Sequence, residues 1–594
     1  NTGVIYATNG IAGGIAGEID NMEIYEVINN AQIGCGSNAN AIASIIGKLN
    51  GSNKSIISNL LNMYQSQQST NVTYRGLIGS LSGNYDFYTA LDMATSKTSD
   101  IIYGSTSVES ANSLVTGANN HVIINKAFID NKSLLNKYTT NVYDGSKYAT
   151  YADIFNDNLL WKLDSADGYY LQFNKEISGT KLDPVGGRYL PTTQGHFNYL
   201  SDMNRKRYGV PCITYPIELS KDITLDKHQP LGKGAYPWKN NINGNNNTII
   251  VSGFVDGLDS QSILGNVFGT KSNNTVISNL KVKYNISSVN KNSGFLMDTG
   301  YETTINNLEI SQGSVDTISV SNITNFGTIA TKLNSSTLVG VTNKQKLSTT
   351  SVSYVGGLVG EITDTNLNSC SNLSNITSTQ NTALGGLVGH AIGELDSNRS
   401  PLSSIINSSV SVDTNTSYSI EGADKVGGLV GESEKYYYFS NTFGSLKFSS
   451  TKFQGRNGTL KGGIVGGIIG QSTQDYVSKC ASYSEINTTN IGGGIVGQAY
   501  GDGYNYSNRS SVISEGDNNS VVETSGNGDT AGGIVGKALN RMSIETCVNN
   551  VYGEVISTTN AGGIVGYADF ANITSCLHKG YSSSIGLSTS VRVG

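Results

Sequence analysis

The chain has 594 residues and a net charge of −6 at pH 7, and only 14% of its residues are charged. This balance gives no basic face, so we expect no nucleic-acid partner. No uninterrupted run of about 20 apolar residues is present, so no transmembrane segment is predicted. The chain starts at Asn1 without a charged-then-apolar leader, and we expect either a removed signal peptide or a longer parent chain.

Residues 1–80 contain a short glycine-rich pattern that returns later in the chain. Its first copy is Gly13-Gly14-Ile15-Ala16-Gly17, and degraded copies lie at 43–47 and 75–79. Between the two degraded copies, Ile57-Ser58-Asn59-Leu60 has the composition of a second strand. We therefore expect residues 1–80 to be the end of a β-solenoid.

The next two segments lack the pattern. Residues 81–180 are predicted to be a non-repeat closing segment, with a short helix over 90–96 and a strand-like stretch near Trp161. Residues 181–250 are predicted to open the next solenoid, because an apolar strand pattern at 215–225 is followed by Trp238.

The main repeat region, 251–594, is defined by the pentapeptide Gly-Gly-(Leu/Ile)-(Val/Ile)-Gly. Its copies recur at uneven intervals of 27 to 42 residues, which is typical of stacked units with insertions in their loops. If the pentapeptide is a strand, each face carries apolar groups or no side chain, so we expect burial on both faces. The glycines predicted to fill these close-packed positions are Gly356, Gly357, Gly360, Gly385, Gly386, Gly389, Gly427, Gly428, Gly431, Gly532, Gly533, Gly536, Gly562, Gly563 and Gly566.

A second short strand follows most copies of the pentapeptide by seven or eight residues. Two short strands joined by a polar turn, repeated in tandem, predict an all-β, right-handed parallel β-solenoid (β-helix) interrupted by a mixed non-repeat segment. The uneven intervals disfavour a propeller with equal blades. The recurring period-2 strands disfavour a disordered, low-complexity coat. Four copies of the second strand end in cysteine: Cys370, Cys480, Cys547 and Cys576.

The pentapeptide and the strand that follows it resemble the GLUG motif of bacterial surface proteins. This motif also occurs upstream of the protease domain in IgA1-protease-like metallopeptidases. The resemblance covers most of 240–594 and returns in 1–80, and it implies a repeat architecture at an extracellular or cell-surface location. No His-Glu-x-x-His is present, so the zinc protease site of those metallopeptidases is missing from this sequence.

The cysteines are expected to stack in the core. Cys547 and Cys576 occupy equivalent strand positions 29 residues apart, which predicts that they lie on adjacent coils. Neighbouring strands lie about 4.8 Å apart, a distance that a disulfide accepts, but stacking alone does not orient the sulfur atoms. Leu280 and Ser408 fill the same position elsewhere, so we expect buried free thiols rather than a bridge.

The sequence favours a protein that is not an enzyme and needs no cofactor. Phosphate-binding and hydrolase motifs are absent, and the five histidines are scattered. Turns such as 501–505 supply oxygen ligands that would suit calcium, so calcium stays open as an alternative, although the nonapeptide calcium-binding spacing is absent.

We expect a structural or adhesive repeat of an extracellular filament, stalk or large adhesin. Residues 1–594 are interpreted as one period of a long tandem array or as part of a single protein. The expected partners are copies of itself or neighbouring repeats, head to tail, and a host or neighbour-cell glycan or protein. Tyrosine clusters at 169–170, 436–438 and 504–506 suit adhesive contacts, although tyrosine is also common on strand surfaces. The alternative function is a carbohydrate-active or carbohydrate-binding solenoid.

Overall fold

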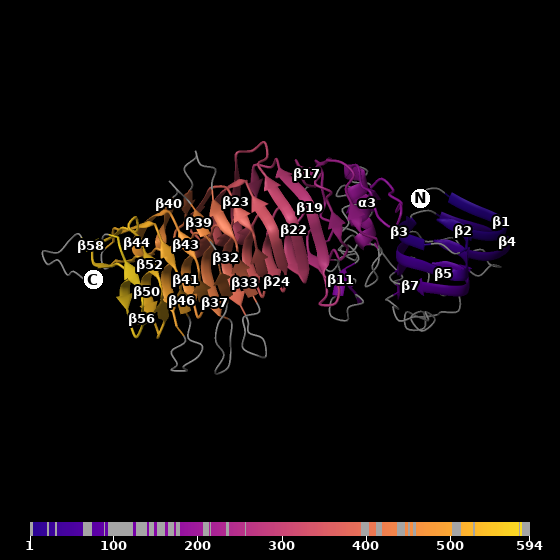
Figure 1. The fold of residues 1–594 in the computed structure, drawn as a ribbon. Helices are drawn as coiled ribbons and strands as arrows, with labels where there is room; N and C mark the ends of the chain where they lie inside the picture. The colour runs from indigo at the N-terminus through magenta and orange to yellow at the C-terminus, as the bar shows by residue number, and fades with distance from the viewer. Residues whose placement is uncertain are drawn as a thin grey trace. The chain divides into compact units, whose positions relative to one another are not determined.

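The chain divides into two compact units, residues 1–179 with 202–213, and residues 180–201 with 214–594. Each unit is described by itself, and Figure 1 follows the chain by colour. The computed structural model describes residues 4–20, 23–29, 32–62, 74–75, 77–87, 90–92, 123–125, 139–141, 148–150, 161–163, 171–173, 179–205, 213, 215–232, 237–255, 257–393, 403–411, 419–435, 446–449, 452–454, 459–501, 512–526, 529–580 and 582–584.

The second unit consists of three long sheets in which every pairing between named strands is parallel. The 21-stranded sheet contains β14 (Ile217–Glu218), β15 (Ile223–Leu225), β16 (Ile242–Asn243), β17 (Thr248–Val251), β19 (Thr275–Tyr284), β22 (Thr303–Ser311), β25 (Thr337–Asn343), β28 (Asn366–Asn368), β29 (Ser371–Asn372), β33 (Ser403–Ile406), β34 (Ser409–Ser411), β38 (Leu446–Ser449), β39 (Lys452–Gln454), β42 (Tyr476–Ser478), β43 (Ala481–Ser482), β46 (Val512–Ser514), β47 (Asp517–Asn518), β51 (Ser543–Glu545), β52 (Val548–Asn549), β56 (Asn572–Thr574) and β57 (Leu577–His578). The 10-stranded sheet contains β18 (Val267–Phe268), β21 (Met297–Tyr301), β24 (Ala330–Asn334), β27 (Val359–Thr363), β32 (Val388–Gly393), β37 (Val430–Lys435), β41 (Ile469–Thr473), β45 (Val496–Tyr500), β50 (Val535–Leu539) and β55 (Val565–Ala568). The 14-stranded sheet contains β20 (Ser288–Val289), β23 (Thr317–Gly327), β26 (Lys346–Gly356), β30 (Ile376–Thr379), β31 (Ala383–Gly385), β35 (Ser419–Glu421), β36 (Lys425–Gly427), β40 (Thr459–Gly466), β44 (Glu485–Gly493), β48 (Val521–Thr524), β49 (Thr530–Gly532), β53 (Val555–Ser557), β54 (Asn560–Gly562) and β58 (Ser582–Ser584).

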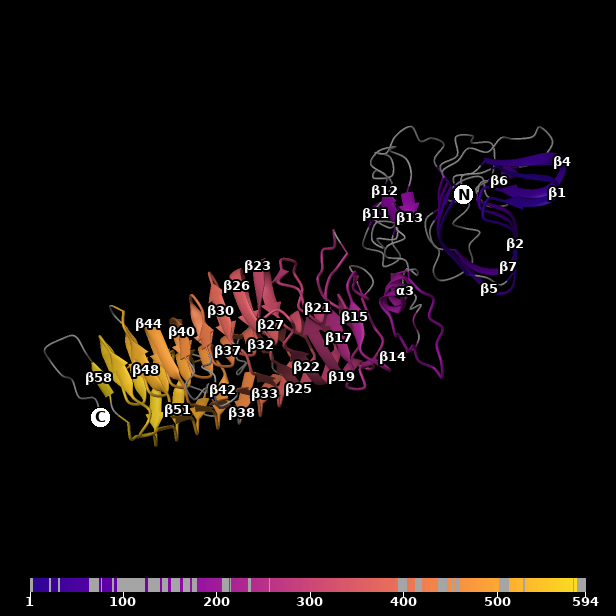
Figure 2. The ribbon, with the colours of Figure 1, turned by 90° about the horizontal axis from the view of Figure 1, so that it is seen from above.

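One turn of the chain visits the three sheets in a fixed order. In a representative coil, β26 of the 14-stranded sheet leads to β27 of the 10-stranded sheet and then to β28 and β29 of the 21-stranded sheet. Successive coils stack in register, so each sheet gains strands along the unit, as Figure 2 shows. Along β30 the exposure alternates between buried and exposed residues, which is the pattern of a strand with one face on a core. The fold is therefore the predicted parallel β-solenoid.

The glycine pentapeptide forms a corner, and the expectation that it is one strand is wrong. β26 ends at Gly356 and β27 begins at Val359, so the motif joins the 14-stranded sheet to the 10-stranded sheet. Leu358 and Val359 are both fully buried, although a straight strand would point them to opposite faces. The bend directs both side chains into the core.

A second fixed bend interrupts the strand of the 21-stranded sheet in most coils. Ser369 lies between β28 and β29 with φ of 54°, in the left-handed region that most residues avoid. Asparagine tolerates this region better than most residues. The same position is left-handed in eight further coils, at Asn279, Asn307, Gly340, Asn407, Lys479, Glu515, Thr546 and Ser575.

Coil length varies mainly at one junction. In the representative coil, β27 ends at Thr363 and β28 begins at Asn366. In three other coils the same link, from the 10-stranded to the 21-stranded sheet, is longer: β32 to β33, β37 to β38 and β45 to β46. The strands on both sides of these links keep their pairing with neighbouring coils.

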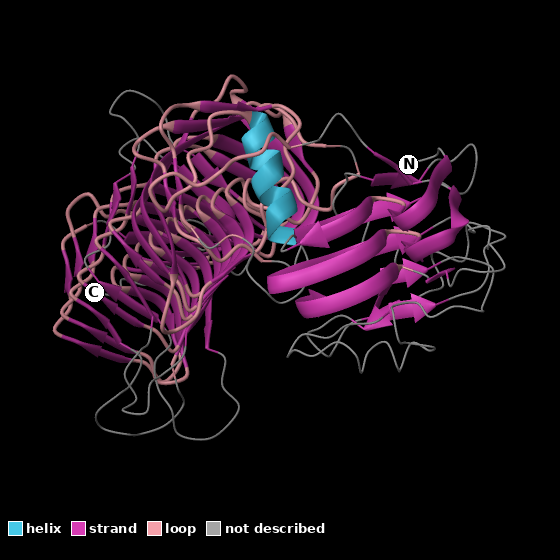
Figure 3. Ribbon diagram, turned by 90° about the vertical axis from the view of Figure 1, so that its right-hand side faces the viewer, coloured by secondary structure: helices cyan, strands magenta, loops and turns pink. Residues whose placement is uncertain are grey.

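Helix α3 (Gln194–Arg205), of which residues 194–201 belong to the second unit, was not predicted by the sequence analysis. Figure 3 shows it in cyan beside the first coils. The hydroxyl of Ser201 donates to the carbonyl of Pro230 at 2.7 Å, and Phe197 packs edge-on against His228 with ring centroids 6.0 Å apart. The predicted opening residue Trp238 is fully buried and donates its indole N–H to the Asn240 carbonyl. Helix and tryptophan together cover the first coils.

The first unit repeats the corner architecture on a smaller scale. Its parallel strands are β1 (Val4–Gly13), β2 (Ala16–Asp20), β3 (Glu23–Asn29), β4 (Gln32–Ala43), β5 (Ile46–Asn62), β6 (Tyr74–Arg75), β7 (Ile78–Phe87), β8 (Ala90–Asp92) and β9 (Ile123–Asn125). Two antiparallel pairs follow, β10 (Thr139–Asn141) with β11 (Tyr148–Thr150) and β12 (Trp161–Leu163) with β13 (Leu171–Phe173). Because β8 is a strand, the expected helix over 90–96 is wrong for its first three residues, and 93–96 lie outside the described residues.

Several sequence features fall outside the part of the chain that the structure describes. These are the tyrosine clusters at 169–170, 436–438 and 504–506 and the acidic turn at 502–505. Among the described residues, no helix has the length and apolar character needed to cross a membrane.

Candidate functional site

The motif glycines are required by close backbone contacts. A Cβ atom on Gly356 would overlap the carbonyl oxygen of Val359 across the corner, and one on Gly360 would lie 2.6 Å from Phe326 N. Real Cβ atoms do not approach so closely, so any side chain at these positions would displace backbone. The same first- and third-glycine contacts recur in the later copies, at Gly385, Gly389, Gly427, Gly431, Gly532, Gly536, Gly562 and Gly566.

The second glycine of each motif faces the next coil and, in several coils, a buried asparagine. A Cβ on Gly533 would overlap both the Gly563 carbonyl and the Asn549 amide, and one on Gly357 would lie 2.8 Å from Asn372 Cγ. These asparagines form a ladder: the Asn518 amide donates to Asn549 Oδ1 at 2.8 Å. In the first unit, Gly14 faces Asn29 in the same way. Where Val410 replaces asparagine, it lies 2.7 Å from a Cβ on Gly386, and Gly428 occupies the same position one copy later.

The four predicted core cysteines are free thiols. Cys370, Cys480 and Cys547 are buried, and Cys576 is half-buried. Glu545 pairs with Thr574 and Val548 with Leu577, so Cys547 and Cys576 lie on adjacent coils as their spacing predicts. Burial raises the pKa of Cys370 and of Cys547 to about 12. A protonated, buried thiol is a weak nucleophile, so these residues fill the core.

We expect an alkylating reagent to distinguish these cysteines in the folded protein. With iodoacetamide at pH 8, Cys576 should react well before Cys370 and Cys547, because only its side chain is partly accessible. Peptide mass spectrometry of timed samples measures each site, and the same reaction in denaturant provides the control. Equal labelling rates in the folded state would contradict the assigned register.

A row of polar side chains runs along the 10-stranded sheet at the residue directly after each motif. This polar ladder is held by strand register, since each member pairs with the equivalent residue of the next coil. Adjacent members therefore lie one strand spacing apart, about 4.8 Å. The polar ladder consists of Lys332, Glu361, His390, Glu432, Gln471, Gln498 and Lys537.

The middle of the polar ladder is unusually buried for charged groups. His390 is 4% and Glu432 is 2% exposed. The ring of His390 stacks on Tyr354 of β26, with centroids 4.4 Å apart and an interplanar angle of 17°. Lys425 of β36 reaches Glu432 Oε1 at 2.5 Å. Side chains of the 14-stranded sheet thus cover the polar ladder at the corner.

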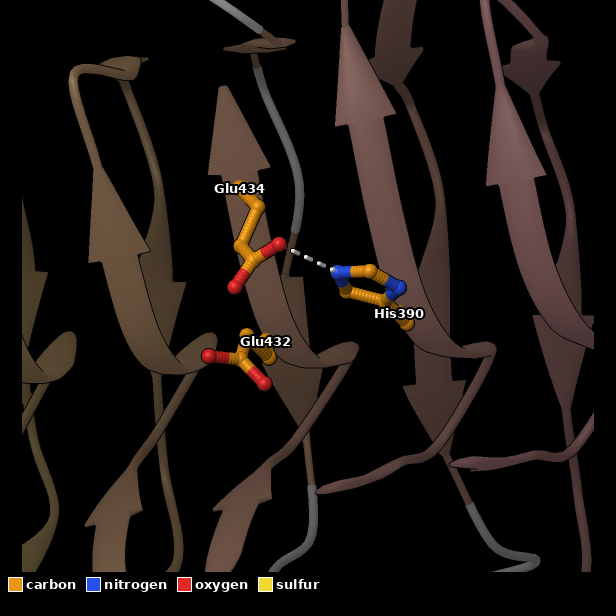
Figure 4. Close-up of side chains that lie close together, drawn as sticks. All are labelled: His390, Glu432 and Glu434. Carbon is orange, nitrogen blue, oxygen red and sulfur yellow. Dashed lines mark ion pairs between the residues drawn. The ribbon is translucent and has the colours of Figure 1, made fainter. Parts of the chain in front are cut away.

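Carboxylates surround His390 on both neighbouring strands. Glu361 Oε2 lies 3.7 Å from Nδ1, and Glu434 Oε2 lies 3.3 Å from Nε2, as Figure 4 shows for Glu434. His390 and the Lys332 ammonium hold the pKa of Glu361 at about 2. Lys332 Nζ lies 2.6 Å from Glu361 Oε1 and is closer than the His390 ring, so we assign the larger part of the lowering of the Glu361 pKa to Lys332. This cluster is the most concentrated group of titratable side chains in the described residues of the polar ladder.

A separate buried carboxyl, Asp298 of β21, allows a pH-dependent prediction. Burial raises its pKa to about 6, against hydrogen bonds from Ser262 and Ser260 that lower it. Because the folded pKa lies above the ordinary value of 3.8, the unfolded chain loses this proton first as the pH rises. Because of Asp298, the free energy of unfolding should therefore fall as the pH rises from about 4 to 6. The loss should persist at pH 7.

The variant Asp298→Asn should remove this dependence. We expect it to be more stable than wild type at pH 7 by about 2 kcal/mol, and similar to wild type at pH 4. Chemical denaturation at both pH values measures the difference, with the exposed Asp259→Asn as control. A variant that is equally destabilised at both pH values would show that the carboxyl is not the group responsible.

The sequence analysis did not find the polar ladder or the cluster at His390. A usable signal was present, because the residue after the third glycine is polar in each copy from Glu361 to Lys537. His390 and Glu432 were not connected because they are 42 residues apart, and only the coil register brings them together.

The stacked coils and their glycine corners define the class of protein as a parallel β-solenoid repeat protein. The chain contains a GLUG motif, which the family model of that name matches at residues 380–416. This span includes the corner at 385–389, His390 and β33. A comparison with curated proteins gave no match.

Proposed function

We propose that this chain is a non-catalytic, extracellular structural or adhesive repeat, which assembles head to tail with copies of itself or with neighbouring repeats. The single observation that supports assembly is the exposure of core positions in the last described coil. Ile573 is 45% exposed, whereas its register partner Ile544, one coil earlier, is fully buried. Leu577 is 47% exposed in the same coil. Among the described residues, β55 is the last strand of its sheet, and an unpaired strand edge favours pairing with a further strand.

The two ends of the second unit's coil stack are not equivalent. The opening end of the second unit is covered by α3 and Trp238, so the two ends of its coil stack are different surfaces. A contact between different surfaces is heterologous, and one that does not close gives a filament. The GLUG motif, typical of repeat proteins, agrees with this proposal.

The alternative, a carbohydrate-active enzyme, has one observation in its favour: Glu361 on β27 and Glu432 and Glu434 on β37 flank the same strand, β32. Against it, Glu432 is 2% exposed and accepts hydrogen bonds from Lys425 and Gln471, so it is not placed to contact a sugar. We therefore favour binding of a glycan or protein without turnover. Release of sugars from polysaccharide by the purified chain would support the enzyme instead.

The assembly proposal is tested on the end coil. The double variant Ile573→Lys/Leu577→Lys should abolish concentration-dependent association in sedimentation and filaments in negative-stain images, because it places two charges on the stacking surface. Tyr476→Lys is the matched control, since Tyr476 is 41% exposed on a side strand, β42. Uniform particles with a mass near 62.8 kDa for both the wild-type chain and the natural polypeptide would reject assembly.

A further inference from the structure

His390 is a buried histidine whose two ring nitrogens lack hydrogen bonds. The side chain is 4% exposed, and neither Nδ1 nor Nε2 has a partner of normal hydrogen-bond geometry. Buried polar atoms nearly always have such a partner, so each exception requires an explanation. The carboxylates at 3.3 and 3.7 Å are close enough for an ion pair but do not meet that geometry.

One ring nitrogen of His390, Nε2, lies beside two carboxylates of the next strand, at 3.3 Å from Glu434 Oε2. His390 pairs in register with Glu432, and Glu434 lies two residues further along the same strand, so both glutamates project from one face of β37. One imidazole nitrogen and one oxygen from each carboxylate lie within 4.8 Å of one another. Figure 4 shows the three side chains converging from β32 and β37.

We infer that His390, Glu432 and Glu434 bind a divalent transition-metal ion, with Zn²⁺ preferred. One imidazole and two carboxylates provide three of the four ligands of a tetrahedral zinc ion, and water supplies the fourth. The half-exposed side chain of Glu434 leaves a route for the ion and for that water. Calcium prefers six or more oxygen ligands, so a site that includes a nitrogen selects against it.

The surroundings of the site suit an ion in that place. Lys425 and Gln471 both donate to Oε1 of Glu432, which leaves Oε2 as the oxygen for the ion. Stacking on Tyr354 fixes the plane of the imidazole, and a metal approaches a ring nitrogen within that plane. This support of a ligand by neighbouring groups is a feature of protein metal sites.

The competing explanation is a protonated His390 that balances the carboxylates without a metal. The titratable groups facing the ring from the packed strands are Glu361, Glu432, Glu434, Lys332, Lys425 and Tyr354. If the competing explanation holds, the chain has no high-affinity Zn²⁺ site at His390. Measurements of zinc binding therefore separate the two explanations.

The test uses the full 594-residue chain without a histidine tag, treated with chelator and dialysed. Titration calorimetry with ZnCl₂ at pH 7.5 should show a site with one ion per chain, and CaCl₂ should give no comparable binding. His390→Gln should weaken zinc binding by at least about 100-fold, and Glu434→Gln by at least about 10-fold. His578→Gln is the control, because it removes a half-buried histidine that lies outside the cluster and should leave the affinity unchanged.

A second readout excludes loss of folding as the cause. Co²⁺ should give visible d–d absorption bands in wild type and in His578→Gln but not in His390→Gln, while all three keep the same circular dichroism spectrum. The inference is overturned if folded wild type binds no zinc, if His390→Gln binds zinc as tightly as wild type, or if Ca²⁺ binds equally well. None of these results depends on filament assembly, so this inference and the proposed function fail independently.

Discussion

The variant Gly533→Ala is expected to destabilise the solenoid by about 3 kcal/mol or more, the upper range of penalties for overpacking a core. A single methyl group at this position would overlap the Gly563 carbonyl of the next coil and the amide of Asn549. The carbonyl belongs to the backbone of a stacked strand, so it cannot move aside as a flexible side chain does. Thermal or denaturant unfolding of the purified chain measures the loss.

A matched control lies elsewhere in the same unit. Gly463 of β40 is outside the motif contacts, and a Cβ there would lie 3.4 Å from the nearest atom, Asp424 O. Gly463→Ala should therefore change stability by less than about 1 kcal/mol. Equal effects of the two substitutions would contradict the close stacking of corners. Gly563→Val, by contrast, meets mainly the His578 side chain, which can rotate, so a smaller loss is expected there.

Replacing Asn549 by valine is expected to cost about 2–4 kcal/mol, although valine occupies the equivalent position at 410. The Asn549 amide donates to the Gly553 carbonyl at 2.9 Å, and its Oδ1 accepts from Asn518. Valine would leave both partners buried without this bond, at about 1–3 kcal/mol each. Val410 pairs in register with Asn372, whose side chain makes its hydrogen bonds with Asn343 and Ser374 instead.

Unfolding measurements on Asn549→Val and on the exposed Asn560→Ala test this expectation. The control should change stability by less than about 0.5 kcal/mol, because its side chain is in solvent. A stable Asn549→Val variant would mean that hydrogen bonds along the asparagine ladder contribute little.

The stacking could be predicted from the sequence, but the shape of each coil could not. The recurring glycines indicated one close contact per turn, and the structure places such contacts at each corner. The pentapeptide is too short for periodicity to separate a strand from a bend. Burial on both faces, which suggested a doubly covered strand, arises because the corner turns Leu358 and Val359 into the same core.

The cluster at His390 could not be predicted from the sequence, for a different reason. Its members come from consecutive coils, and the interval between them includes a link of variable length, so no fixed spacing connects them. Composition also pointed away from it, since five scattered histidines in 594 residues suggest surface positions. Only the pairing register between successive strands of the 10-stranded sheet shows that the polar residues after each motif form a continuous row.

The placement of the long links separates two kinds of sequence change in this protein. The links after β32, β37 and β45 leave from one sheet and return to another whose pairing is the same in short and long coils. Because the flanking strands keep their pairing, the length of a link should add only a small loop-closure term to the free energy of folding. Lineages can therefore change the length of these links at little risk to folding, and a foreign peptide inserted between 393 and 403 should leave the solenoid folded.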